Sequence, residues 1–186
     1  VDRRSAFRQR VAATALGSYQ LLCLGGERLS HPRKYQDIVT KYAAEYGVPE
    51  AVIYTMLKVE SGFDSTKHGE HDKIGLLQLT PALYVRLATE AHDAEMNAAA
   101  LYDPDTNIRY GTYCLSYLYD RYGNWETAIA AYNGGLGNVD KWLEDDRYAD
   151  ADGEGGLKRI PFKETRQFVT RVTDAWEMYE KLYNNS

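Results

Sequence analysis

Hydrophobic residues from Tyr35 onward recur every three or four positions, which is the spacing of one buried face of an α-helix. Glycine and proline divide this pattern into segments, because glycine favours the residue after a helix and proline favours its first turn. No stretch alternates apolar and polar residues for long enough to indicate a strand. The chain is therefore predicted to be all-α. The expected helices span residues 35–47, 49–62, 81–91, 103–123, 125–133 and 161–183.

One acidic residue interrupts the apolar face of the helix expected over 49–62. Apolar residues occupy the preceding positions of this face, namely Val52, Ile53, Met56 and Leu57. The next position is Glu60, and burying an unpaired carboxylate there costs several kcal/mol or keeps the group protonated. Glu60 also lies in the last helical turn, where the negative end of the helix dipole raises its pKa, and Ser61 and Gly62 let the chain turn away beside it.

This placement of Glu60 favours acid–base chemistry. A carboxylic acid that is still protonated near neutral pH can act as a general acid, and protonating a glycosidic oxygen is the commonest task of such a group. The structural alternative is a glutamate at a helix end that faces solvent or pairs with an arginine. The rest of the sequence has to decide between the two.

The N-terminal segment permits two interpretations. Residues 1–10 are basic, and residues 11–26 are mostly apolar but interrupted by polar residues, so that no run is long enough to span a membrane. The segment is either a degenerate export or anchor segment or an amphipathic helical arm packed on the domain. We therefore divide the chain into an arm, residues 1–34, and one domain, residues 35–186.

Composition narrows the function classes. The 186 residues, 44% of them hydrophobic, suit one compact domain, and 22 basic against 27 acidic residues give a formal net charge of -5. No charge pattern indicates binding to nucleic acid or to an anionic membrane surface, so an acidic polymer would have to be held by local contacts. Cys23 and Cys114 could form one disulfide, but the sequence does not decide whether they do. Cys114 is interpreted as a small core residue because it lies on an apolar stripe.

Four short motifs, at helix ends and helix starts, occur in a distinctive order. They are Glu60-Ser61, GLLQ at 75–78, AYNGG at 131–135 and IPFKETRQFV at 160–169. Together they resemble the soluble lytic transglycosylase family, whose catalytic domain shares the goose-type lysozyme fold. The resemblance covers roughly residues 35–183. It implies a lysozyme-like (goose-type) helical domain, with the N-terminal helical arm outside it.

The resemblance also implies a reaction. In such enzymes one glutamate, here Glu60, cleaves the β-1,4 bond between N-acetylmuramic acid and N-acetylglucosamine in peptidoglycan and leaves a 1,6-anhydro ring. No cofactor is implied, and the expected partner is the glycan strand, bound by a monomer. Since peptidoglycan lies outside the cytoplasmic membrane, the domain is expected to be extracytoplasmic in a bacterium. Membrane association is expected only through the N-terminal segment.

The motifs give candidate substrate-binding residues by the same resemblance. Gln78 is expected to offer an amide to a sugar, and Gly75 to let the backbone approach it. Tyr132 and Asn133 precede a glycine pair that must break a helix, so they can point into a cleft, with Tyr132 the stronger candidate. Their structural alternative is a core tyrosine and an asparagine that caps a turn. The full expected set is Ser61, Gly75, Leu77, Gln78, Tyr132, Asn133 and Phe168.

Three departures from the family pattern qualify this picture. Leu77 stands where methionine is usual, a harmless exchange of volume, and Phe168 lacks the hydroxyl of the usual tyrosine. The loop before GLLQ carries Gly69, Asp72 and Lys73 where small residues are usual. If Asp72 or Glu70 in this loop faces the cleft, the second carboxylate could activate water and the enzyme would hydrolyse like a lysozyme. A solvated polar loop is the structural alternative, and a catalytically weak peptidoglycan-binding scaffold is the alternative function from another class.

No metal site is predicted. His68 and His71 lie together on a loop, which is a poor metal signal. Acidic residues alternate at 150–154 before a glycine like the start of a calcium loop, but Pro161 stands where that loop needs its bidentate glutamate. We interpret this stretch as an acidic surface loop.

Overall fold

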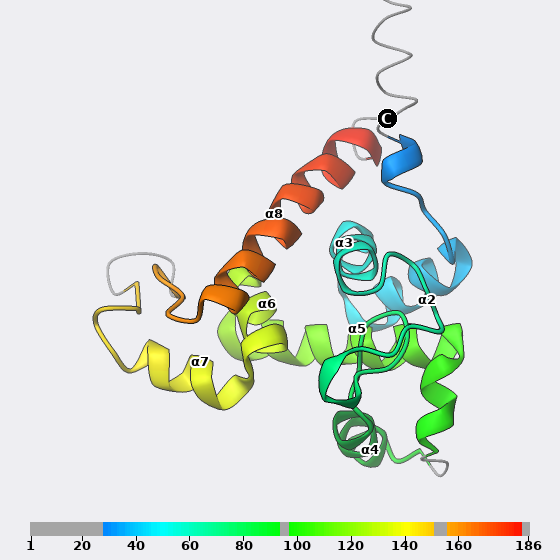
Figure 1. Ribbon diagram of the computed structural model, residues 1–186, viewed down its shortest axis with the longest axis horizontal. Helices are drawn as coiled ribbons and strands as arrows, with labels where there is room; N and C mark the ends of the chain where they lie inside the picture. The colour runs from blue at the N-terminus through cyan, green and yellow to red at the C-terminus, as the bar shows by residue number, and fades with distance from the viewer. Residues whose placement is uncertain (1–27, 94–96, 151–155, 184–186) are drawn as a thin grey trace, which may run out of the picture.

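The computed structural model describes residues 28–93, 97–150 and 156–183, and within them the fold is helical (Figure 1). The described residues contain isolated β-bridges but no strand, so the all-α prediction is confirmed. The α-helices are α2 (Gln36–Tyr46), α3 (Glu50–Glu60), α4 (Pro81–Glu90), α5 (Pro104–Tyr122), α6 (Trp125–Gly134), α7 (Leu136–Leu143) and α8 (Lys163–Tyr183). Two short 3₁₀ helices, η1 (Glu70–Asp72) and η2 (Ala98–Tyr102), lie in the connections.

The ends of the helices follow the predicted signals closely. Gly47 ends α2 in the left-handed conformation, with φ of 68°, which a residue without Cβ adopts without strain. Asp103 caps α5, because its carboxylate accepts a hydrogen bond from the Thr106 amide at 2.9 Å. Pro49 stands at the N-cap of α3, one position before the first turn where the sequence placed it. No helix was expected at α7, which starts directly after the glycine pair at the end of α6.

The core forms where α5 packs against α2 and α6, and α8 packs against α3 and α6 (Figure 1). Its fully buried members include Val39, Ile53, Met56, Leu57, Leu115 and Ile129. Cys114 belongs to this core, as predicted, and burial raises the pKa of its thiol to about 12. Cys23, the predicted N-terminal arm up to residue 27 and most of the acidic stretch at 150–154 lie outside the described residues.

The packing of α6 on α8 fixes one side of the site. Gly134 lies so close to α8 that an added Cβ would come within 2.9 Å of the Thr165 hydroxyl. Gly135 follows with φ of 88° and breaks the chain away from α6. The end of α6 and the start of α8 are therefore held together, and the residues on both can face one cleft. No helix within the described residues is long and apolar enough to cross a membrane.

Candidate active site

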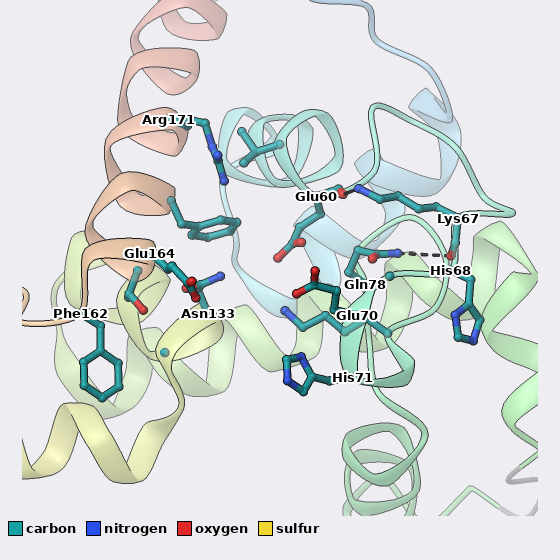
Figure 2. A pocket seen from close by; sticks show the side chains of 16 residues that line it. Glu60, Lys67, His68, Glu70, His71, Gln78, Asn133, Phe162, Glu164 and Arg171 are labelled. Atoms are coloured by element: carbon teal, nitrogen blue, oxygen red, sulfur yellow. Dashed lines mark hydrogen bonds between the residues drawn. The ribbon is translucent and has the colours of Figure 1, made fainter.

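A cleft of about 860 Å³ lies between the C-terminal end of α3, the loop that follows it, the end of α6 and the start of α8 (Figure 2). Each of these elements contributes functional side chains because each ends or begins at the cleft. Charged and amide side chains dominate its walls, while one side is lined by the rings of Phe162, just before α8, and Phe168, on α8. The polar and charged lining residues are Glu60, Lys67, His68, Glu70, His71, Lys73, Gln78, Asn133, Glu164, Thr165 and Arg171.

Glu60 is the buried carboxylate of this cleft. It is the last residue of α3 and is only 7% exposed, as its place on the apolar face predicted. Its Oε1 atom is buried and has no hydrogen-bond partner among the described residues. Burial raises the pKa of Glu60 to about 7, although the positive charges of Lys73, Lys67 and Arg171 lower it. Near neutral pH a large share of this carboxyl therefore carries a proton.

Gly75 allows close packing of the backbone beneath the cleft. It has φ of 76°, and a Cβ there would lie 2.4 Å from both the Asn107 amide nitrogen and the Leu101 carbonyl oxygen. Asn107 is fully buried, accepts a hydrogen bond from the Leu77 amide at 2.7 Å, and donates to the Ile74 and Leu101 carbonyls at 2.9 and 2.8 Å. The glycine thus lets the chain approach Asn107, whereas the resemblance implied that it lets the chain approach a sugar.

Of the other GLLQ residues, Leu77 lies beneath the cleft and Gln78 lines it. Leu77 is fully buried and packs on Gly111, where an added Cβ would lie 2.2 Å from the Leu77 side chain, so it lies beneath the cleft. Gln78 lines the cleft but is only 5% exposed. Its amide nitrogen donates to the Lys67 carbonyl at 3.3 Å (Figure 2) and also to the Gly75 carbonyl at 2.8 Å. The Gln78 amide therefore also fixes the loop that it faces.

Tyr132 and Asn133, at the end of α6, differ in whether they line the cleft. The Tyr132 hydroxyl donates to the Leu77 carbonyl at 2.7 Å, and burial raises its pKa well above the usual value, with the charge of Glu60 acting in the same direction. Tyr132 supports the GLLQ segment, whereas Asn133 lines the cleft itself. The sequence ranked these two in the opposite order as candidates for the cleft wall.

Ser61 and Phe168 complete the expected set. Ser61 caps α3: its hydroxyl donates to the Leu57 carbonyl and accepts from the Phe63 amide, both at 3.1 Å. This geometry ends the helix next to Glu60 and keeps Ser61 out of the cleft lining. Phe168 lines the cleft at 4% exposure, and the Arg171 guanidinium lies 5.9 Å from the centre of its ring.

The loop between α3 and the GLLQ segment is folded back on itself. The Gly69 amide donates to the Lys73 carbonyl at 2.7 Å, and His68 bridges to Ile74. A Cβ on Gly69 would lie 2.0 Å from the Gln78 amide oxygen, so a side chain at this position would have to displace the Gln78 amide. At the tip of the loop, two non-glycine residues, His71 and Asp72, adopt left-handed backbone conformations with φ of 58° and 57°.

The tip of this loop decides which acidic residue faces the cleft. Glu70 lines the cleft, and Figure 2 shows its carboxylate directed toward Glu60. Asp72 is exposed and is not among the lining residues. His68 and His71 line the cleft at its edge, and within the described ranges no group of three or more His, Cys, Asp or Glu side chains is arranged to hold a metal ion.

Several residues of the site were not singled out from the sequence. Lys67 donates to the backbone carbonyl of Glu60, and Arg171 enters the cleft from α8. Both residues appeared only as ordinary polar positions of a loop and of a helix face. Asn107 had one usable signal, because an asparagine inside the long helix expected over 103–123 occupies a position that packs inward.

The comparisons with known proteins agree with this geometry. Residues 37–153 match the family model of the transglycosylase SLT domain. The chain belongs to this family. The resemblance found in the sequence motifs is thereby confirmed, and the goose-type lysozyme-like fold expected from it is supported by solved SLT structures.

Two curated relatives illustrate how the SLT domain occurs in longer proteins. The chain is 29% identical over 160 residues to the soluble lytic murein transglycosylase of Escherichia coli, covering 82% of this chain and 24% of that protein. It is 32% identical over 167 residues to the membrane-bound lytic murein transglycosylase C of Actinobacillus pleuropneumoniae, covering 79% of this chain and 46% of that protein. The chain therefore spans about a quarter of the length of the first relative and just under half of the second.

Solved structures of SLT proteins have the same fold. An inactive glutamate-to-glutamine variant of the lytic transglycosylase Slt of Pseudomonas aeruginosa superposes with a TM-score of 0.73 at 29% identity, over 83% of this chain and 25% of that chain. The 70-kDa soluble lytic transglycosylase of Escherichia coli gives a TM-score of 0.73 at 26% identity, over 83% of this chain and 25% of that chain.

Proposed function

We propose that this chain is a lytic transglycosylase that cleaves the β-1,4 bond between N-acetylmuramic acid and N-acetylglucosamine in peptidoglycan. The observation that carries the proposal is Glu60, a buried carboxyl with a pKa raised to about 7 and an unpaired oxygen, in the wall of a cleft of about 860 Å³. Membership of the SLT family supports the same substrate, and the relatives named above are called murein transglycosylases.

Glu60 performs both proton transfers in the proposed reaction. Its carboxylic acid protonates the glycosidic oxygen as the bond from the anomeric carbon to that oxygen breaks, while the N-acetyl carbonyl of the muramic acid stabilises the developing positive charge. The resulting Glu60 carboxylate then removes the proton from the C6 hydroxyl of the same sugar, and O6 bonds to the anomeric carbon. Glu60 recovers its proton, no water is consumed, and the product carries a 1,6-anhydro ring.

The other lining residues hold the glycan in this proposal. Gln78 and Asn133 present amide groups at the cleft wall, and Phe168 gives an apolar surface for a sugar face. Ser61, Gly75, Leu77 and Tyr132 act from beneath, by fixing the end of α3 and the GLLQ segment. We further propose that the protein acts as a monomer in the bacterial cell envelope, where its substrate lies.

Mass spectrometry of the products tests the proposal. Purified peptidoglycan is digested with the wild-type protein and with Glu60→Gln, and the soluble muropeptides are compared. Anhydro-muropeptides from the wild type and their loss with Glu60→Gln are expected. If a folded wild-type protein releases no muropeptides, the proposed catalytic activity is wrong.

A second candidate reaction, hydrolysis at the same bond, is favoured by Glu70. Its carboxylate lines the cleft and is directed toward Glu60, which is the arrangement of a second carboxylate that removes a proton from water while the oxygen of that water bonds to the anomeric carbon (Figure 2). Digestion in ¹⁸O-labelled water separates the reactions, because hydrolysis places the label in a reducing end and cyclisation incorporates none. Loss of the labelled product in Glu70→Gln, with the anhydro product retained, would assign the hydrolytic share to Glu70.

A further inference from the structure

A second cavity, of about 520 Å³, lies on a different flank of α8 from the active-site cleft. It is formed by the outer side of α8 and the first turn of α6, and none of its lining residues lines the cleft. Its volume falls in the range of about 300–1,000 Å³ that is typical of small-ligand sites. We call this cavity the α6–α8 pocket. Its lining residues are Glu126, Thr173, Trp176, Glu177 and Glu180.

The α6–α8 pocket is separate from the cleft because α8 directs the side chains of the two sites away from each other. Arg171, which lines the cleft, and Trp176, which lines the pocket, are five residues apart on α8. At 3.6 residues per turn, their side chains point about 140° apart around the helix axis. The buried residues Val172 and Tyr179 project between these two directions into the core. The pocket is therefore not an extension of the cleft.

Trp176 supplies a flat apolar surface whose orientation is fixed. The residue is partly exposed, and its Nε1 atom donates to Oε1 of Glu180, one helical turn later, at 3.1 Å. The Trp125 ring meets the Trp176 ring edge-on with centroids 6.2 Å apart, and Trp125 in turn stacks on Tyr119 at 4.2 Å. A ring that is already held in place loses little conformational freedom when a ligand binds. The exposed part of the indole is thus preorganised for a flat partner.

Hydrogen-bond acceptors surround this indole. Glu126, Glu177 and Glu180 place carboxylates at the pocket, and Thr173 adds a hydroxyl oxygen. Among the described residues, the salt bridges engage other carboxylates, and none engages Glu126 or Glu177. Of the described residues that line the pocket, none is a lysine, arginine or histidine. The carboxylates of Glu126 and Glu177 therefore keep oxygens available for a ligand that donates hydrogen bonds.

We propose that the α6–α8 pocket is a second, non-catalytic glycan-binding site that takes an N-acetylglucosamine ring of peptidoglycan, an inference that rests on the proposed function. One face of a pyranose ring presents C–H bonds with partially positive hydrogens, which pack on the electron-rich face of an indole. The hydroxyl groups at the edge of the ring donate to carboxylates. The same carboxylates repel the acidic stem peptide of muramic acid, so the pocket selects the neutral sugar.

A second glycan-binding site has its effect on an insoluble polymer. A protein that is held to the wall through the pocket meets the bonds of neighbouring strands at a raised effective concentration, so binding in the cleft and in the pocket reinforce each other. A short soluble fragment cannot occupy both sites at once. The pocket therefore raises activity on intact sacculi and leaves activity on short fragments unchanged.

The first arm of the test measures the ratio of these two activities. Rates of cleavage are determined on sacculi and on soluble tetrasaccharide fragments of the glycan strand. Trp176→Ala should lower the ratio of the sacculus rate to the fragment rate roughly three- to tenfold, because the flat surface is lost. Trp176→Phe keeps a smaller ring and should lower the ratio less. Glu177→Gln, at an exposed position, should lower it roughly two- to fivefold through a weakened hydrogen bond.

A matched control isolates the pocket from the general effect of charge. Glu144→Gln changes the net charge as Glu177→Gln does, and Glu144 is exposed after α7 and lines neither the cleft nor the pocket. It should leave the ratio at the wild-type value. Circular dichroism of each variant checks that it is folded.

The second arm needs no catalysis and observes the two sites separately. The chain has three tryptophans, so three indole N–H signals are expected in NMR spectra and are assigned with single Trp→Phe variants. Trp142 packs edge-on against Phe162 of the cleft at 4.9 Å and reports on the cleft, whereas Trp176 reports on the pocket. Glu60→Gln protein is titrated with tetra-N-acetylchitotetraose. A saturable shift of the Trp176 signal is expected, with an affinity that Glu177→Gln lowers roughly two- to fivefold while the response of Trp142 stays the same.

The outcomes distinguish the pocket from the proposed catalysis. If the Trp176 signal responds in this way but the wild type cleaves no strands, the pocket is supported and the proposed catalysis fails. If strands are cleaved and neither the ratio nor the Trp176 signal responds, the pocket inference is wrong and the catalysis stands. A Trp176 signal that shifts with a lysine-rich peptide but not with the chitotetraose also overturns the inference, because the pocket would then recognise cations.

Discussion

Two buried polar side chains near the cleft, Asn107 beneath it and Glu60 in its wall, have opposite hydrogen-bonding states. Asn107 is fully buried and makes three hydrogen bonds to the backbone. Glu60 is 7% exposed and keeps one oxygen without a partner among the described residues. A satisfied buried polar group stabilises one structure, whereas an unsatisfied one is costly and persists where it serves chemistry. The floor of the site is thus built for stability and its wall for reactivity.

The largest expected effect tests the reactive side of this comparison. Glu60→Gln keeps the shape of the side chain and removes the exchangeable proton, so the rate of muropeptide release should fall roughly a hundred- to ten-thousand-fold. The free energy of unfolding should not decrease, because the variant no longer buries an ionisable group. Initial rates and urea denaturation measure the two quantities. Glu144→Gln, at an exposed residue after α7 outside the cleft, is the control.

Replacing the fully hydrogen-bonded Asn107 should lower the stability of the protein. Asn107→Leu leaves the Leu77 amide and the Ile74 and Leu101 carbonyls buried without partners, and each lost partner costs about 1 kcal/mol or more. We expect the free energy of unfolding to fall by about 3 to 5 kcal/mol, as measured by urea denaturation. Asn97→Ala removes an exposed cap of η2 and should cost about 1 kcal/mol. Equal losses in the two variants would contradict the role given to Asn107.

The pH dependence of stability should reveal the state of Glu60. Its pKa rises from 4.5 to about 7 on folding, so the folded protein holds the proton more tightly than the unfolded chain. The stability linked to this group is complete below about pH 4.5 and is lost as pH rises to about 7, by about 3 kcal/mol in all. The difference in unfolding free energy between the wild type and Glu60→Gln, measured from pH 4 to 8, should show this slope. A constant difference would mean that Glu60 ionises normally.

Tyr132→Phe should give the smallest effect and separate support from contact with substrate. It removes the hydroxyl that donates to the Leu77 carbonyl and should lower the unfolding free energy by about 1 kcal/mol. Because Tyr132 supports the GLLQ segment from behind, kcat should fall only a few-fold. A loss of activity as large as that of Glu60→Gln would instead place the hydroxyl in the reaction.

The sequence predicted those features that depend on local pattern. The six expected helices, the glycine cap at Gly47 and the buried position of Glu60 follow from spacing and from residue type, and the structure has them, together with α7, which was not expected. The individual tasks within the motifs did not follow, because they depend on residues far apart in the chain. Gly75 accommodates Asn107, and Tyr132 holds Leu77 across 55 positions. The residue types of Gly75 and Tyr132 indicated a functional site, but not which residue each one contacts.

The cations around Glu60 also could not be predicted from local sequence pattern. Lys67 and Arg171 are more than a hundred positions apart, and only the packing of α3 on α8 brings both to one carboxylate. Periodicity predicts which face of a helix is buried. It does not predict which charged side chains, far apart in the sequence, lie near the same buried carboxylate. For the acidic loop residues, the sequence left open whether Asp72 or Glu70 faces the cleft or whether the loop is only solvated, and in the fold Glu70 lines the cleft while Asp72 is exposed.

Gln78, Asn107 and Tyr132 all bind backbone atoms of the segment from Lys67 to Leu77. The course of this segment is therefore set by partners outside its tip, and the side chains from Glu70 to Lys73 contribute little to holding it. Such a tip can change its chemistry during evolution while the scaffold stays intact. For protein engineering, these four positions form a replaceable cassette through which the outcome of cleavage can be altered without rebuilding the enzyme.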